Sequence, residues 1–225
     1  MPPQHDPTVR RPGAVLRRRR ERRADRPLSK IASRHPVFHA AVIEDARVAL
    51  AYRAERRPFT GRRDQVHQVI RLCLVSDAFL AQVCYRAKAS MQAAGIPVLP
   101  RIAHRLAMSL AQVCIGDPVI VGPGLYLPHG QVVFDGVVEI GHNVTVRPWV
   151  TIGLKDGDFN GAHIDPHVRI GTGAKIIGPV HIGEGAFIGA NAVVVDDVPA
   201  HAVAAGVPAR ILDARTAKDR KRAGS

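Results

Sequence analysis

Residues 164–194 read IDPHVRIGTGAKIIGPVHIGEGAFIGANAVV, and this stretch decides the fold. Its aliphatic anchors recur at every sixth position, namely Ile164, Ile170, Ile176, Ile182, Ile188 and Val194. A repeat of fixed period indicates a solenoid, in which each repeat contributes one short strand and one turn. Three such hexads make one triangular coil, so equivalent residues of successive coils should stack about 4.8 Å apart as parallel strands.

The same period extends upstream of this stretch. The earlier anchors are Ile115, Val121, Leu127, Val133, Ile140, Val146 and Ile152, with a slip of one residue between Gly136 and Glu139. From Ile152 to Ile164 the interval doubles, and residues 154–163 carry no hexad pattern. We therefore expect a loop that leaves the coil there, and loops on rigid scaffolds are common places for binding and catalysis.

Between His35 and Val113 the apolar residues follow a helical spacing instead, as in Val42, Ile43, Ala46, Ala49 and Leu50. Breaks fall near Pro58 and at residues 95–100, because proline cannot continue a helix. This pattern predicts three helices, over residues 36–56, 63–93 and 101–113. The predicted fold class is α+β, with a helical domain at 35–113 followed by a parallel β-helix at 114–212.

The net charge of +13 is concentrated in the two ends of the chain. Residues 1–34 include the run Arg17 to Arg20, and residues 213–225 are also basic, with few apolar side chains in either segment. Such segments cannot bury enough surface to fold, so we expect disordered, solvated tails. RNA or an acidic surface is the alternative partner, but no aromatic residues are interleaved for base stacking, and we expect no nucleic-acid partner.

Neither a membrane segment nor a secretory signal is visible in the sequence. The cysteines are Cys73, Cys84 and Cys114, an odd number without metal-ligand spacing. We expect reduced thiols and a cytoplasmic protein without a membrane partner.

Residues 35–212 resemble the serine acetyltransferase branch of the hexapeptide-repeat acyltransferases. The resemblance rests on five motifs that occur in the family's order: AFLAQVCYR at 78–86, IVGPGLYLPHG at 120–130, VTIG at 150–153, IGTGAKIIG at 170–178 and AGVPAR at 205–210. It implies that the β-helix is left-handed and that the chain transfers an acetyl group from acetyl-CoA to a hydroxyl group.

The resemblance also implies a catalytic base, His129, which lies in the Leu-Pro-His-Gly turn. Imidazole suits this role because its ordinary pKa lies near neutrality. The family orients this histidine with an aspartate fifteen residues earlier, where this chain has Cys114. We expect Asp117 to substitute for that aspartate, and we interpret Cys114 as a buried structural cysteine rather than an acyl carrier.

The family's substrate pocket is only partly matched. An aspartate that precedes the family's catalytic histidine is Pro128 here, while Asp64 and His163 are the candidates for binding the acceptor. L-serine or a small hydroxylated relative is the expected acceptor, and a sugar or another small metabolite is the alternative. The residues expected to bind the coenzyme are Gly153, Gly173, Ala174, Lys175, Ala190 and Arg210.

The resemblance implies a homotrimer with the coenzyme in a shared cleft, or a dimer of such trimers joined through the helices. No complex with cysteine synthase is expected, because the chain ends Ala223-Gly224-Ser225 and not with the family's isoleucine. A γ-carbonic anhydrase, with His163 and His167 as metal ligands, is a remote alternative, and we expect no metal. A scaffold without catalytic activity is the third alternative.

Overall fold

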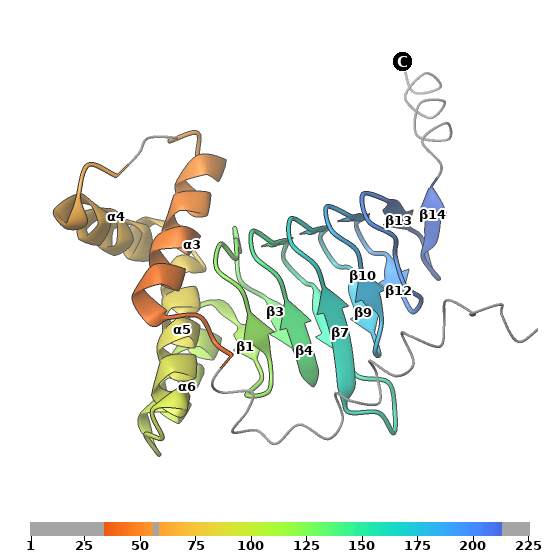
Figure 1. Cartoon of the computed structure of the whole chain (residues 1–225), viewed down its shortest axis with the longest axis horizontal. Helices are drawn as coiled ribbons and strands as arrows, with labels where there is room; N and C mark the ends of the chain where they lie inside the picture. The colour runs from red at the N-terminus through yellow and green to blue at the C-terminus, as the bar shows by residue number, and fades with distance from the viewer. Residues whose placement is uncertain (1–33, 56–58, 213–225) are drawn as a thin grey trace, which may run out of the picture.

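A computed structural model describes residues 34–55 and 59–212, so the predicted tails, except for Arg34, lie outside the described residues. The described chain forms a group of helices at one end and a three-sided solenoid that extends away from them (Figure 1). The helices are α3 (Phe38–Tyr52), α4 (Arg62–Val75), α5 (Phe79–Ala93) and α6 (Leu99–Ala111).

The prediction of one helix over residues 63–93 is wrong. The chain breaks at Ser76, whose backbone is extended at φ −115° and ψ 126°, and α4 and α5 meet there at 118°. Serine and aspartate are poor helix formers, because their side chains compete for backbone hydrogen bonds, and Ser76-Asp77 supplies both. No single described helix is long and apolar enough to cross a membrane, and α4 and α5 meet that criterion only as this bent pair.

The solenoid contains three sheets, one on each side of a triangular prism. Their strand orders are β1-β3-β6-β9-β12, β10-β7-β4-β2 and β14-β13-β11-β8-β5. The strand bounds are β1 (Val113–Ile115), β2 (Ile120–Val121), β3 (Val132–Phe134), β4 (Val137–Ile140), β5 (Thr145–Val146), β6 (Thr151–Gly153), β7 (Asn160–Ile164), β8 (Arg169–Ile170), β9 (Lys175–Ile177), β10 (His181–Ile182), β11 (Phe187–Ile188), β12 (Val193–Val194), β13 (Val203–Ala205) and β14 (Arg210–Leu212).

Strands of successive coils pair in parallel, as the repeat predicts. Ile164 lies opposite Ile182, and Ile170 lies opposite Ile188. The last pair, β13 with β14, is antiparallel. The stacking of residues one coil apart is therefore confirmed.

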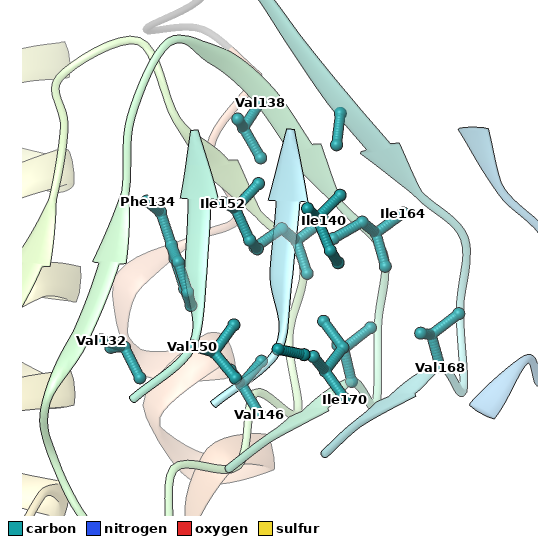
Figure 2. Packing of buried hydrophobic residues seen from close by; sticks show 14 of the residues in the cluster. Val132, Phe134, Val138, Ile140, Val146, Val150, Ile152, Ile164, Val168 and Ile170 are labelled. Carbon is teal, nitrogen blue, oxygen red and sulfur yellow. The ribbon is translucent and has the colours of Figure 1, made fainter. Parts of the chain in front are cut away.

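The anchors fill the interior of the prism with aliphatic side chains (Figure 2). One anchor was predicted wrongly: Val133 is 41% exposed, whereas Val132 and Phe134 are fully buried. Side chains alternate across a strand, so only one of two neighbouring residues can point inward. The slip of one residue therefore falls between Leu127 and Phe134, in the turn of Gln131 (φ 63°), and not at residues 136–139.

A buried ion pair holds the helices against the first coil. The Arg86 guanidinium contacts both carboxylate oxygens of Asp45 at 2.9 and 3.0 Å, which joins α5 to α3. The same guanidinium donates to the carbonyl of Val121 at 2.6 Å, while Asp45 accepts from the backbone N–H groups of Gly124 and Leu125. Tyr85 adds a hydrogen bond from its hydroxyl to the carbonyl of Val119. The Tyr85-Arg86 motif thus docks the helical domain on the solenoid.

Candidate active site

One edge of the prism carries the turn that contains His129. The turns 128–131, 147–150, 171–174 and 189–192 lie one above another along it, and we call this the His129 edge. Backbone hydrogen bonds join consecutive turns, since Trp149 donates to Gln131 at 2.8 Å, Gly173 to Pro148 at 2.9 Å and Asn191 to Thr172 at 2.8 Å. The edge is therefore a rigid track that starts at His129.

The imidazole of His129 contacts a carboxylate from the helical domain. Its Nδ1 lies 2.6 Å from Oδ2 of Asp77, which belongs to the short connection between α4 and α5. An ionised carboxylate can only accept here, so Nδ1 donates the hydrogen bond, and in the neutral imidazole Nε2 is the nitrogen with the lone pair. Both side chains are well exposed, at 60% and 70%. The arrangement leaves a base nitrogen open to a substrate.

Close packing fixes the backbone around His129. A Cβ atom on Gly130 would lie 1.5 Å from the carbonyl oxygen of Ala111, so only glycine fits there. The N–H of Gln131 donates to that same carbonyl at 2.8 Å. The C-terminal end of α6 thereby directly supports the turn that contains His129.

The prediction that Asp117 orients His129 is wrong. The Asp117 carboxylate contacts Nζ of Lys88 at 3.0 Å, and Lys88 also donates to the carbonyl of Ile115. Although desolvation opposes the shift, hydrogen bonds from Gln92 and Lys88 hold the pKa of Asp117 below its usual range. Asp117 thus serves the junction between α5 and the first coil.

Cys114 was expected to be buried, but the structure shows it half-buried. It lies on β1 between the buried Val113 and Ile115, so it faces away from the solenoid interior. It lines a groove of about 730 Å³ between α6 and the first coil, together with Asp117. An aspartate at this position would therefore sit in that groove.

Several of the residues predicted to bind the coenzyme gather along the His129 edge. Gly173 and Ala190 lie in its turns, Ala174 is buried beside them, and Lys175 follows on β9. The Lys175 ammonium donates to the carbonyl of Trp149 at 2.6 Å. The Arg210 side chain is 67% exposed, and its guanidinium lies 3.9 Å from a carboxylate oxygen of Asp196. Gly153 ends β6 and lies one edge further round the prism.

The two residues predicted to bind the acceptor come from other parts of the chain. Asp64 lies in the first turn of α4, where it accepts from the N–H of Thr60 at 3.2 Å. His163 lies on β7, in the sheet opposite the His129 edge. A single chain therefore does not place His163 on the same edge as His129, and both acceptor roles stay predictions.

The structure separates the two histidines of the carbonic anhydrase alternative. His167 packs edge to face against His142, with ring centroids 4.9 Å apart. His163 lies beside His181 instead, with ring centroids 5.3 Å apart. Within one chain, each of these two histidines thus has a different histidine as its ring neighbour.

Sequence reasoning did not identify Asp77. It falls inside a segment that was predicted as one helix, and 52 residues separate it from His129. The only pointer in the sequence is the Ser76-Asp77 pair, which is a poor helix interior.

Comparison with known proteins gives a consistent set of relatives. The family described as Bacterial transferase hexapeptide (six repeats) matches residues 161–196. A serine acetyltransferase from Helicobacter pylori (strain J99 / ATCC 700824) is 33% identical over 136 residues, which cover 59% of this chain and 79% of the relative. Other curated serine acetyltransferases are longer, and the chain spans 60% and 53% of the length of two of them.

Two solved structures are similar to the described chain. Soybean serine acetyltransferase complexed with serine has 31% identity and a TM-score of 0.65, covering 80% of this chain and 71% of that one. Serine acetyltransferase from Brucella abortus strain S19 in complex with coenzyme A has 26% identity and a TM-score of 0.63, covering 76% and 66%. These likenesses confirm the predicted fold class, a helical domain followed by a left-handed parallel β-helix.

Proposed function

Because the chain belongs to the serine acetyltransferase family of hexapeptide-repeat acyltransferases, we propose that it is an acetyl-CoA-dependent O-acetyltransferase. The observation that carries this proposal is the contact between His129 and Asp77 at the start of a rigid edge. L-serine, or a small hydroxylated relative of it, is the proposed acceptor.

His129 is the proposed general base. Its Nε2 takes the proton of the acceptor hydroxyl while the hydroxyl oxygen attacks the thioester carbonyl carbon of acetyl-CoA. The tetrahedral intermediate then collapses, the carbon–sulfur bond breaks, and the imidazolium returns the proton to the leaving thiolate. Asp77 holds the imidazole through Nδ1, so that the same nitrogen faces the substrate in both steps.

The coenzyme is proposed to lie along the His129 edge. Small residues at Gly173 and Ala190 leave room for an extended chain to lie flat against the turns, beside the buried Ala174. Lys175 and Arg210 place cationic groups close to that track, where the phosphate groups of the coenzyme would bind. Gly153, which lies on the next edge of the prism, is also proposed to contact the coenzyme.

The acceptor site is proposed to include Asp64, for an ammonium group, and His163. One observation favours a different acceptor: Pro128 precedes His129 where the family has an aspartate, so one carboxylate of the pocket is missing. A sugar or another small metabolite that carries a hydroxyl or amino group is therefore the second candidate. The acetyl-transfer chemistry at His129 is the same for both.

A homotrimer, or a dimer of such trimers, is the proposed assembly. It is supported by the position of His163 on the sheet opposite the His129 edge, since a neighbouring chain can bring the two together. The exposed apolar side chains of α4 and α6 support a contact through the helices.

The test is release of free thiol from acetyl-CoA by the purified chain, with a panel of acceptors led by L-serine. We expect release with serine that His129→Ala lowers by about 10²- to 10⁴-fold. His142→Ala, which removes an exposed imidazole from another turn, is the matched control and should keep the rate. Release with a different acceptor only would retain the chemistry and replace the substrate. An unchanged rate in His129→Ala would reject His129 as the catalytic base, and no release with any acceptor would favour a scaffold.

A further inference from the structure

Two histidines and an aspartate meet on the sheet opposite the His129 edge. His163 on β7 and His181 on β10 are direct neighbours in the parallel ladder, and Asp165 follows β7. Nε2 of His163 lies 3.1 Å from Oδ1 of Asp165, and Nε2 of His181 lies 2.8 Å from Oδ2 of the same carboxylate. One ligand atom from each residue falls within 4.8 Å of the other two.

A second layer of polar groups orients these side chains. Nδ1 of His163 lies 3.4 Å from Oε2 of Glu139, whose side chain is only 10% exposed. Glu139 is in turn contacted by Arg34. A histidine that points one ring nitrogen at a carboxylate and the other at a shared point has the arrangement of a metal ligand with its outer-sphere partner.

The ladder makes the arrangement rigid. Consecutive coils fix the backbones of β7 and β10 in register, and the N–H of His181 donates to Asp197 at 2.8 Å. The three side chains are half-buried, at 35%, 26% and 39% exposed, so the cluster still opens to solvent. A cation could enter without unfolding of the coil.

We propose that His163, Asp165 and His181 form a binding site for one divalent transition-metal ion, with Zn²⁺ as the best fit. Two imidazoles and one carboxylate match the ligand preference of Zn²⁺, whereas Mg²⁺ and Ca²⁺ require oxygen ligands. Three protein ligands leave the fourth tetrahedral position to water or a small anion. The ion would cross-link two consecutive coils.

This site lies on another face and contains none of the groups assigned to proton transfer. The ion and an acceptor would, however, compete for Nε2 of His163. Metal binding is therefore measured without acyl donor or acceptor, so that its result does not depend on the enzyme assay.

The experiment titrates metal-free, tag-free protein with Zn²⁺ by calorimetry and with Co²⁺ by visible absorption. We expect one equivalent per chain, the absorption bands of four-coordinate Co²⁺, and a Zn²⁺-dependent rise in melting temperature. His181→Asn and Asp165→Asn should lose all three. Glu139→Gln should keep the stoichiometry and weaken binding by about 10- to 100-fold, as expected for an outer-sphere partner.

His167→Asn is the matched control, because it removes a histidine from the same solenoid and asparagine accepts the positive φ of 61° found there. It should bind the ion as the unchanged protein does. Circular dichroism establishes that each variant is folded. The proposal is overturned if the folded wild type takes up no stoichiometric ion, or if His181→Asn and Asp165→Asn bind it with unchanged affinity.

Discussion

His129 and Asp77 are 52 residues apart in the sequence and 2.6 Å apart between Nδ1 and Oδ2. The family aspartate that would orient the histidine is replaced here by Cys114, whose side chain faces a groove beside α6. A carboxylate is nevertheless present, because the break between α4 and α5 brings Asp77 to the catalytic turn. In the proposed mechanism, the positioning carboxylate therefore comes from the connection between α4 and α5.

Asp77→Asn is expected to lower kcat by about 10- to 100-fold. This is less than the loss expected on removal of the base itself. The amide can donate to Nδ1 and so favours the wrong tautomer, whereas the binding of acetyl-CoA is untouched and its KM should not change. Steady-state kinetics measures kcat and the KM for acetyl-CoA separately. Asp77→Glu should recover part of the loss in kcat.

Asp117→Asn is the control for this prediction, because Asp117 contacts Lys88 and not His129. It should lower the free energy of unfolding and leave kcat close to the wild-type value. Full activity in Asp77→Asn would remove Asp77 from the proposed mechanism.

Because His35 is partly buried, we expect the free energy of unfolding to depend on pH. Burial, together with the nearby charges of Arg86 and Lys88, lowers the pKa of His35 to about 4. In the unfolded chain the imidazole takes up its proton near pH 6.5, so the unfolded state binds more protons between those values. The free energy of unfolding is therefore fully retained above about pH 6.5 and falls as the pH drops towards 4.

His35→Phe should remove part of this loss, since phenylalanine fills a similar space and takes up no proton. Urea unfolding at pH 7.5 and pH 5.0 measures it, and the difference between the two pH values should be smaller in the variant than in the wild type. His39→Phe changes an exposed histidine and serves as the control. Equal pH dependence in all three proteins would contradict the assignment to His35.

Among the elements, α5 is the one that joins the two parts of the described chain. Its buried residues Gln82, Tyr85, Arg86 and Lys88 each donate a hydrogen bond to a carbonyl of the first coil. Without these side chains, the carbonyl groups at the end of the coil would be buried under the helices without a hydrogen-bond partner, and an unpaired buried backbone group is costly. The helical domain therefore caps the solenoid and positions Asp77 at the same time.

Arg86→Met is expected to destabilise the chain by about 3 to 5 kcal/mol, because it leaves the Asp45 carboxylate buried without its cation. Chemical denaturation measures the loss. The control is Arg47→Met, which breaks the exposed Arg47–Glu44 pair and should cost about 1 kcal/mol or less. Equal losses in the two variants would mean that Arg86 does not hold the domain to the coil.

At the scale of the whole molecule, the helical end presents two apolar stripes to solvent. On α4 the exposed side chains are Val66, Ile70 and Leu74, and on α6 they are Leu99, Ile102, Leu106 and Leu110. The spacing along each helix places these residues on one face. Exposed apolar surface of this kind is typical of a protein–protein contact, which agrees with the proposed assembly.

We expect a mass of three or six chains in solution by light scattering. If six chains assemble through the helices, Leu74→Glu should reduce the particle to three, because Leu74 is 82% exposed and a charge there opposes burial. Val195→Glu, in the last coils of the solenoid, is the control and should leave the mass unchanged. A monomeric wild type would contradict both proposed assemblies.

The sequence by itself determined the solenoid, its coil length and most of its interior, because each hexad is a local unit whose inward residue is set by its place in the repeat. The same locality allowed His129 and the small residues of its edge to be located from motifs. Val133 was predicted wrongly because a slip of one residue, in the turn at Gln131, changes which side chain points inward.

Only the tertiary structure decided which groups meet across the elements. Asp77 reaches His129, Asp117 turns to Lys88, and His163 joins Asp165 and His181 because helices dock and coils stack. These contacts depend on the break at Ser76 and on the register between coils, and both follow from the packing of many distant residues. The hexad repeat already places His181 one coil after His163, but no local pattern encodes the contacts of Asp77 and Asp117, and this is the physical reason why those contacts could not be predicted from the sequence.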